Sequence, residues 1–261
     1  MIKAKKSLGQ NFLIDNKILE IIVNTIDIEN KTVLEIGPGT GNLTNYIFKK
    51  KPKKFLAIEK DNKLAEDLRS KYLDNLQIIN DDVLNINESN LFEEKVIVFG
   101  NLPYNISTEI LSKWIVNLRD NVWFEALILM FQKEVADRII ANINSSNYGR
   151  LTILANWKLN ISKITDIKPN SFKPKPKVDS SLLFFTPKKN FYKIKNPKNL
   201  EKITRIFFSN RRKMIRKPYN QIFNGDLRVL ENLKINLNLR PQNLNLDTYY
   251  KLTEEYEKLT G

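Results

Sequence analysis

The sequence contains neither cysteine nor histidine among its 261 residues. This absence excludes cysteine and histidine nucleophiles, zinc fingers, zinc deaminases and disulfide scaffolds, although Asp, Glu and Asn remain as ligands for a hard cation. We expect no metal cofactor. A chain without cysteine suits the reducing cytoplasm, where we expect this protein to act. No run of about 18 apolar residues is present, so the sequence predicts no membrane-spanning helix.

The positive charge is concentrated near the C-terminus. Residues 1–186 carry 26 basic and 22 acidic side chains, whereas residues 187–261 carry 17 and 7. Basic residues between 188 and 217 lie among apolar ones such as Phe207, which is typical of a folded surface for an anionic partner, nucleic acid above all. A solvated face and a basic helix on a membrane surface are the alternatives. The residues predicted to bind this partner are Arg205, Arg211, Arg212, Lys213 and Arg216.

Short apolar segments rich in β-branched and aromatic residues alternate with amphipathic segments up to residue 131. This alternation favours a parallel sheet covered by helices, a doubly wound α/β fold. Asp15 can cap the first helix. The predicted strands are 32–36, 55–58, 76–79, 96–99 and 124–130, with helices at 62–69 and 108–118 between them.

Two later apolar segments, 161–167 and 181–186, have no helix between them and are predicted to form an antiparallel pair that closes the sheet. Residues 187–197 form a basic linker bounded by prolines. Apolar residues then recur at helical spacing. We therefore predict two domains: an α/β domain, residues 1–186, and a basic helical domain that binds nucleic acid, residues 187–261.

The first predicted strand runs directly into the glycine-rich sequence Glu35-Ile36-Gly37-Pro38-Gly39-Thr40-Gly41. Glycines at the carboxyl end of such a strand let the backbone approach a ligand closely. The spacing is G-x-G-x-G rather than the dinucleotide G-x-G-x-x-G, and the G-K-[ST] of a phosphate-binding P-loop is absent. A tight turn without a ligand is the alternative.

Acidic residues follow the next two predicted strands. Glu59 lies 22 residues after Gly37, an offset typical of an acid that binds ribose hydroxyls. Asp81 and Asp82 follow the third strand, where a carboxylate can accept from an adenine amino group. Single acids at strand ends are common. The glycine-rich loop, Glu59 and the Asp81-Asp82 pair, however, stand in register at the ends of three successive strands, and together they favour a cofactor that contains adenosine.

The fourth predicted strand ends in Gly100-Asn101-Leu102-Pro103-Tyr104. Pro103 restricts the backbone and favours an extended Leu102. The Asn101 side-chain oxygen and the Leu102 carbonyl can then converge on the exocyclic amino group of a base, and Tyr104 offers a ring for stacking. Two acceptors on one amino group make its nitrogen lone pair available for attack. An ordinary Asn-X-Pro turn is the alternative.

Together with Gly9-Gln10-Asn11-Phe12-Leu13 and Phe172-x-Pro174-x-Pro176-x-Val178-Asp179-Ser180, these motifs resemble those of the S-adenosylmethionine-dependent RNA adenine N6-dimethyltransferases. The resemblance spans residues 5–217 in order. It departs from the family after Lys213, where Met214-Ile215-Arg216-Lys217 replaces the frequent Thr-Leu-Arg-Asn.

The resemblance implies a class I, Rossmann-like methyltransferase fold and S-adenosyl-L-methionine as cofactor. It implies cofactor contacts at Asn11, Leu13, Gly37, Glu59, Asp82 and Asn101. It implies a catalytic set of Asn101, Leu102, Pro103, Tyr104 and Phe172, with Phe172 stacking on the second face of the target adenine.

The implied substrate is 16S ribosomal RNA in the small ribosomal subunit. The family dimethylates two adjacent adenosines in a hairpin loop near the 3′ end of that RNA during ribosome biogenesis. We expect the protein to act as a monomer, with no membrane partner. The alternatives are a resistance-type methyltransferase that modifies large-subunit RNA, and a binding protein that keeps the fold without catalysis.

Overall fold

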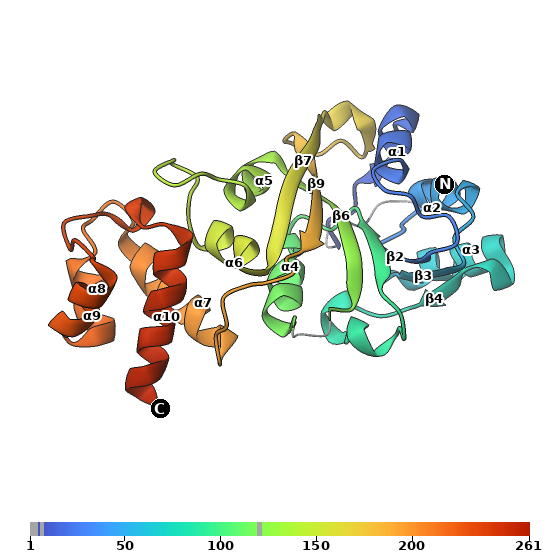
Figure 1. Ribbon diagram of the computed structural model, residues 1–261. Helices are drawn as coiled ribbons and strands as arrows, with labels where there is room; N and C mark the ends of the chain where they lie inside the picture. The colour runs from blue at the N-terminus through green and yellow to red at the C-terminus, as the bar shows by residue number, and fades with distance from the viewer. Residues whose placement is uncertain (1–4, 6–7, 119–121) are drawn as a thin grey trace. The chain divides into compact units, whose positions relative to one another are not determined.

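The computed structural model describes residues 5, 8–118 and 122–261 (Figure 1). The chain divides into two compact units. The first contains the residues up to 136 together with 160–187, and the second contains residues 137–159 and 188–261.

A seven-stranded mixed sheet forms the centre of the first unit, in the order β4-β3-β2-β5-β6-β9-β7. Its strands are β2 (Thr32–Ile36), β3 (Lys54–Ile58), β4 (Gln77–Ile79), β5 (Val96–Gly100), β6 (Phe124–Gln132), β7 (Leu159–Ile167) and β9 (Ser180–Pro187). Strands β4, β3, β2, β5 and β6 are parallel neighbours, and β9 runs antiparallel to β6. The five predicted parallel strands are confirmed to within two residues at each end.

Strands β7 and β9 run in opposite directions, as the sequence predicted. The Lys188 amide donates to the Lys158 carbonyl at one end, and the Ser181 hydroxyl donates to Asp166 near the other. Strand β7 is the last strand in the order of the sheet and forms one of its edges.

Every residue of β2 and β5 is buried, which shows that both faces of the sheet are covered. The helices of this unit are α1 (Asn16–Val23), α2 (Asn42–Lys49), α3 (Asn62–Tyr72) and α4 (Ser107–Asn117), and α5 (Lys133–Ile139) crosses into the second unit. The Asp15 carboxylate accepts from the first amides of α1, and Asp61 caps α3 in the same way. The expected doubly wound α/β fold is thus confirmed.

A small second sheet joins two motifs that are far apart in the sequence. Strand β1 (Phe12–Leu13) pairs antiparallel with β8 (Phe172–Lys173), so that Phe12 lies opposite Lys173 and Leu13 lies opposite Phe172. The N-terminal motif and the proline-containing motif are therefore adjacent in space.

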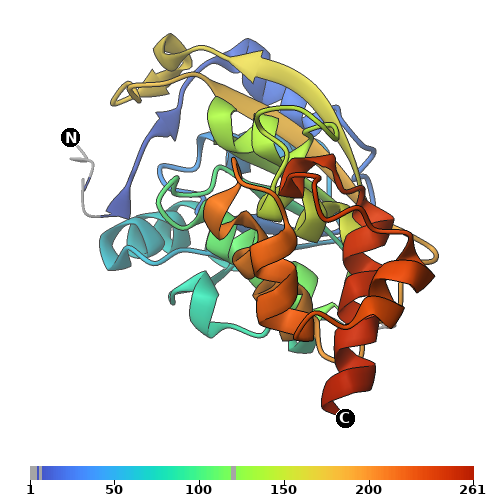
Figure 2. The same cartoon turned by 90° about the vertical axis from the view of Figure 1, so that its left-hand side faces the viewer.

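The second unit is helical. It contains α6 (Arg150–Lys158), α7 (Pro197–Phe207), α8 (Arg216–Phe223), α9 (Leu227–Leu233) and α10 (Leu246–Thr260), and α10 contacts α6, α7 and α9 (Figure 2). Short 3-10 helices complete the chain at Leu73–Asn75, Val83–Asn85, Glu88–Asn90, Pro169–Ser171, Phe208–Asn210 and Pro241–Asn243.

The division into units differs from the predicted domains in one respect. A break does fall between Pro187 and Lys188, but residues 137–159 belong with the C-terminal helices. The Tyr250 hydroxyl donates to the Ile153 carbonyl, and the Trp157 indole donates to the Tyr192 carbonyl. These contacts of α6 have no local signature in the sequence, so the simple boundary at 187 missed them.

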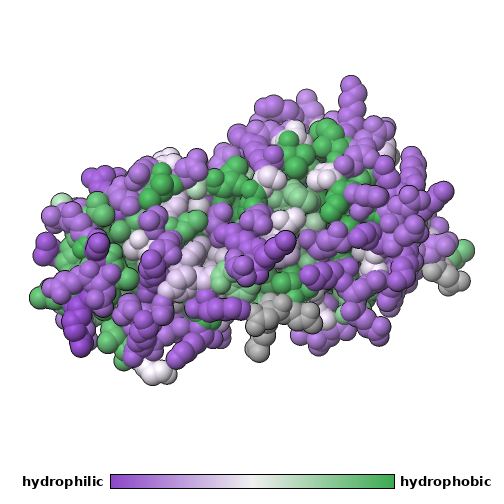
Figure 3. Space-filling model, viewed as in Figure 1, coloured by the Kyte–Doolittle hydropathy of each residue, from purple (hydrophilic) through white to green (hydrophobic). Residues whose placement is uncertain are grey.

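Hydrophilic residues cover most of the face shown in Figure 3, with small groups of apolar residues between them. Among the residues that the structure describes, no helix is long and apolar enough to cross a membrane. Nor does that part of the chain contain a cluster of three or more acidic side chains arranged to hold a metal ion.

Candidate active site

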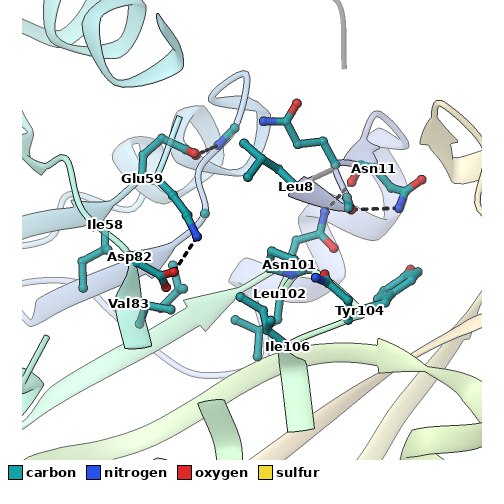
Figure 4. Close-up of a pocket in the computed structure, with 18 of the residues that line it drawn as sticks. Leu8, Asn11, Ile58, Glu59, Asp82, Val83, Asn101, Leu102, Tyr104 and Ile106 are labelled. Atoms are coloured by element: carbon teal, nitrogen blue, oxygen red, sulfur yellow. Dashed lines mark hydrogen bonds and ion pairs between the residues drawn. The ribbon is translucent and has the colours of Figure 1, made fainter. Parts of the chain in front are cut away.

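A cleft lies at the carboxyl ends of the parallel strands of the first unit (Figure 4). Its walls come from the N-terminal segment and from the loops after four neighbouring strands. The lining residues fall in the segments 8–12, 36–39, 58–60, 81–83 and 101–106. A cleft in this place is where open α/β sheets bind their ligands.

The glycine-rich loop lies in the wall of the cleft, and all three of its glycines have positive φ: 66° at Gly37, 58° at Gly39 and 79° at Gly41. A Cβ on Gly39 would lie 2.8 Å from the Phe12 ring, so the loop and strand β1 can approach only without a side chain there. A Cβ on Gly37 would meet only the Asn101 carbonyl, at 3.9 Å, and would otherwise extend into open space. Gly37 thus leaves room for a ligand beside the backbone.

Glu59 joins this loop to helix α3. Its Oε2 accepts from the Gly39 amide at 3.0 Å, and its Oε1 accepts from the Asp61 amide at 2.9 Å. Burial raises the pKa of Glu59, although these two hydrogen bonds act to lower it. The carboxylate therefore fixes the shape of the loop as well as facing the cleft.

Asp82 lines the cleft after β4 and pairs with Lys60, whose Nζ lies 2.6 Å from its Oδ2. Burial acts to raise the pKa of Asp82, but the Lys60 ammonium and the Leu84 amide hold it below its usual range. The neighbouring Asp81 accepts from the Asp82 amide. The structure thus brings the predicted acids at the ends of β3 and β4 to the same cleft.

Asn101 has its side-chain amide oriented by the N-terminal segment. Its Nδ2 donates to the main-chain carbonyl of Asn11 at 2.8 Å. Its Oδ1 accepts no hydrogen bond from the described residues, and neither does the Leu102 carbonyl. Two acceptors of the kind that can orient an amino group are therefore left available beside the cleft.

Tyr104 lines the same part of the cleft, and its hydroxyl is hydrogen-bonded to Ser180 at the start of β9. Ser180 is fully buried, so this contact fixes the Tyr104 ring from behind. In the sequence, Ser180 stands out only as the last residue of the motif that begins at Phe172, and no local pattern places it in the site.

The N-terminal segment closes one side of the cleft. Gln10 Nε2 donates to Asp61 Oδ2 at 3.1 Å, and Lys5 Nζ lies 2.9 Å from the same oxygen. Asn11 lines the cleft, and its side-chain Nδ2 donates to the Gly9 carbonyl. The predicted contact Leu13 lies instead in a smaller adjoining pocket, together with Gly37, Asn101 and Glu35.

Glu35 is a buried acid that sequence reasoning did not single out. The Thr44 hydroxyl donates to it at 2.7 Å. Burial raises the pKa of Glu35 to about 8, and the nearby Glu59 adds to the shift. The predicted doubly wound sheet implies that this strand is buried, but the contact of Glu35 with Thr44 appears only in the folded structure.

Phe172 does not line the cleft that the structure describes, so its stacking on the target adenine stays a prediction. The side chain is 1% exposed and belongs to the hydrophobic core, where its neighbour across the small sheet is Leu13. Its place in β8 accounts for this burial. In this conformation Phe172 therefore supports the core.

Comparison with known proteins is consistent with this geometry. The family model described as "Ribosomal RNA adenine dimethylase" matches residues 1–258. The chain belongs to this family. A ribosomal RNA small subunit methyltransferase A from Pelagibacter ubique (strain HTCC1062) is 65% identical over 260 residues, which cover 100% of this chain and 99% of that protein. The protein of the same name from Wolbachia sp. subsp. Drosophila simulans is 42% identical, with coverage of 99% and 96%.

Solved structures agree with the family assignment. A dimethyladenosine transferase from Plasmodium falciparum has a TM-score of 0.80 at 29% identity, covering 95% of this chain and 98% of that one. The 23S rRNA methyltransferase ErmE has a TM-score of 0.68 at 22% identity, with coverage of 95% and 100%, which shows a shared fold.

The cleft fits S-adenosylmethionine, the cofactor that membership of this dimethylase family implies. Gly37 leaves space next to the backbone, and the acceptors Glu59 and Asp82 stand at successive strand ends, where an adenosine needs partners for its hydroxyl and amino groups. Ile58, Val83 and Ile106 add apolar walls. Sequence reasoning missed these three residues, although their positions at strand and loop ends were a usable signal.

The predicted RNA-binding residues of the second unit are not equivalent. Arg205, Arg212 and Lys213 are exposed, and their side chains have no partner among the described residues. Arg216 is exposed and reaches Asn238 at 3.4 Å. Arg211 is half-buried, and its guanidinium donates to the Tyr148 carbonyl at 3.2 Å. Arg211 therefore holds the unit together and is less available to a phosphate than its neighbours.

Proposed function

We propose that this protein uses S-adenosyl-L-methionine to dimethylate N6 of two adjacent adenosines in 16S ribosomal RNA of the small subunit. The target is a hairpin loop near the 3′ end of that RNA, and the reaction belongs to ribosome biogenesis in the cytoplasm. Relatives that are 65% and 42% identical over nearly the whole chain carry small-subunit methyltransferase names, which supports this choice of substrate.

One observation carries the chemistry: the side chain of Asn101 is held by the Asn11 carbonyl so that its Oδ1 stays available in the cleft that Tyr104 also lines. A target adenine must leave its stack to reach this place. Its N6 amino group then donates to Asn101 Oδ1 and to the Leu102 carbonyl, while the base stacks on Tyr104.

These acceptors draw the nitrogen lone pair out of conjugation with the ring. S-adenosylmethionine, when bound, supplies a methyl group activated by a positively charged sulfur. The chain's part is to fix the reacting nitrogen in line with that group, through the glycine-rich loop and Asn101. After methylation the nitrogen carries a positive charge and releases its proton to solvent, so no side chain has to act as a base.

The test is a methyl-transfer assay on purified, unmodified ribosomal subunits with labelled S-adenosylmethionine. We expect label in small subunits, mapped to two neighbouring adenosines as dimethyl products. Label confined to large subunits would instead indicate a resistance-type methyltransferase. Cofactor and RNA binding without any transfer would indicate a binding protein that has kept the fold.

We also infer that exposed basic residues of the second unit bind RNA phosphates. Replacing Arg205, Arg212 and Lys213 together by Ala should weaken RNA binding and reduce the slope of log affinity against log salt by about 0.7–0.9 for each phosphate that is no longer bound. Cofactor affinity should not change. Arg211→Ala is the comparison variant. It should lower the free energy of unfolding and leave the salt slope nearly unchanged. An unaltered slope in the triple variant would place the RNA surface elsewhere.

A further inference from the structure

The loop 173–179 carries three lysines whose role the reaction at the cleft does not explain. Lys173, Lys175 and Lys177 are all exposed, and none has a hydrogen bond or ion pair with the described residues through its side chain. The acid in the same loop, Asp179, is already paired with Lys168, whose Nζ lies 2.6 Å from Asp179 Oδ2. The three charges are therefore not balanced locally.

Both ends of this loop are attached to walls of the cleft. At its start, Lys173 lies opposite Phe12 in the small sheet, and Phe12 lines the cleft. At its end, Ser180 is hydrogen-bonded to the Tyr104 hydroxyl, and Tyr104 lines the cleft as well. The loop thus borders the part of the cleft that holds Asn101 and Tyr104.

The loop is also restrained. Pro174 and Pro176 each fix one backbone dihedral, and the Lys133 amide donates to the Asp179 carbonyl at 2.9 Å. Lysines on a restrained backbone lose less conformational freedom when they bind a partner.

Charge differs between the two sides of the cleft. On the side of Glu59 and Asp82, two lysines are paired with acids: Lys60 with Asp82 and Lys5 with Asp61. On the Tyr104 side, the three loop lysines remain unbalanced. A cofactor nucleoside needs no excess of cations, whereas an RNA strand that delivers a base to Tyr104 brings phosphates with it.

We propose that Lys173, Lys175 and Lys177 bind the sugar-phosphate backbone of the RNA strand next to the flipped target base. This surface rests on the proposed function and names a contact in the first unit, separate from the basic residues of the helical unit. This contact holds the strand so that the target base meets the Asn101 acceptor and the Tyr104 ring.

The test compares the full-length protein with a Lys173→Ala, Lys175→Ala, Lys177→Ala variant. The matched control is Lys53→Ala, Lys54→Ala, Lys95→Ala, which removes the same charge. These control lysines are exposed and precede or begin β3 and β5, at the amino ends of the strands, away from the cleft.

Affinity is measured between 50 and 200 mM salt for deproteinised small-subunit RNA and for unmodified small subunits. Removing three lysines that each bind a phosphate of single-stranded RNA reduces the slope of log affinity against log salt by about 2. Between the lowest and the highest salt, the affinity of the loop variant should therefore fall by a factor roughly 18 times smaller than the affinity of wild type. Its affinity should be weaker at low salt and approach wild type at high salt. The control should follow wild type, and both variants should bind S-adenosylmethionine normally.

Several results would overturn the proposal: a wild-type slope in the loop variant, an equal change in the control, or weaker binding to subunits with unchanged binding to deproteinised RNA. The last would indicate a ribosomal protein as the partner. These outcomes differ from failure of the proposed function, in which wild-type protein itself transfers no methyl group to small-subunit RNA.

Discussion

Asn101→Ala tests the chemistry most directly, because the structure separates two roles of this side chain. Its Nδ2 donates to the Asn11 carbonyl at 2.8 Å, and its Oδ1 is the available acceptor. Removing the Nδ2 donor eliminates an ordinary hydrogen bond, so we expect the free energy of unfolding to fall by about 1 kcal/mol. Removing the Oδ1 acceptor eliminates a group aimed at the reacting amine, which typically costs about 10²–10³ in rate, or roughly 2.7–4 kcal/mol.

The assay is a single-turnover methyl-transfer rate at saturating RNA and cofactor, with cofactor affinity and urea unfolding measured on the same preparation. We expect the rate to fall at least a hundredfold while cofactor affinity changes much less. Asn101→Asp is the companion variant, since it keeps an oxygen but places a carboxylate against the Asn11 carbonyl. It should lose the orientation and remain severely impaired.

A rate within tenfold of wild type for Asn101→Ala would refute the role of this residue. Equal losses in rate and in cofactor affinity would mean that Asn101 acts through the cofactor rather than on the target amine. A loss of stability of several kcal/mol would mean that the rate reports damage to the fold.

The Tyr104 ring, the Glu35 carboxyl group and the orientation of the target amine each give a further prediction. Tyr104→Phe should stay within tenfold of the wild-type single-turnover rate, whereas Tyr104→Ala should lose target affinity worth about 1–3 kcal/mol; equal inactivity of both would exclude ring stacking as the explanation. Because the pKa of Glu35 is raised from 4.5 to about 8, its contribution to stability is complete below about pH 4.5 and is lost progressively as the pH rises to about 8. Glu35→Gln should therefore flatten the dependence of the urea midpoint on pH between 5.5 and 8, and an unchanged dependence would contradict the assignment. The single-turnover rate should be nearly constant from pH 6 to 8 at fixed salt, because orientation replaces a base; a tenfold rise per pH unit would require one.

Local sequence pattern alone predicted the parallel strands, the glycine-rich loop and the acids after β3 and β4. These features depend on short-range periodicity and on the rule that parallel strands present their carboxyl ends at one edge. The same rule placed Asn101 and Tyr104 beside Gly37 and Glu59, and the structure puts all four in one cleft.

Other features were decided only by tertiary structure. Pairing of β1 with β8 buries Phe172 and brings Lys173 opposite Phe12, and no local pattern sets the register of two two-residue strands. The contact of Arg211 with Tyr148 and the inclusion of residues 137–159 in the helical unit depend on long-range packing. The raised pKa of Glu35 has the same origin, because it depends on which atoms exclude water from the carboxyl group.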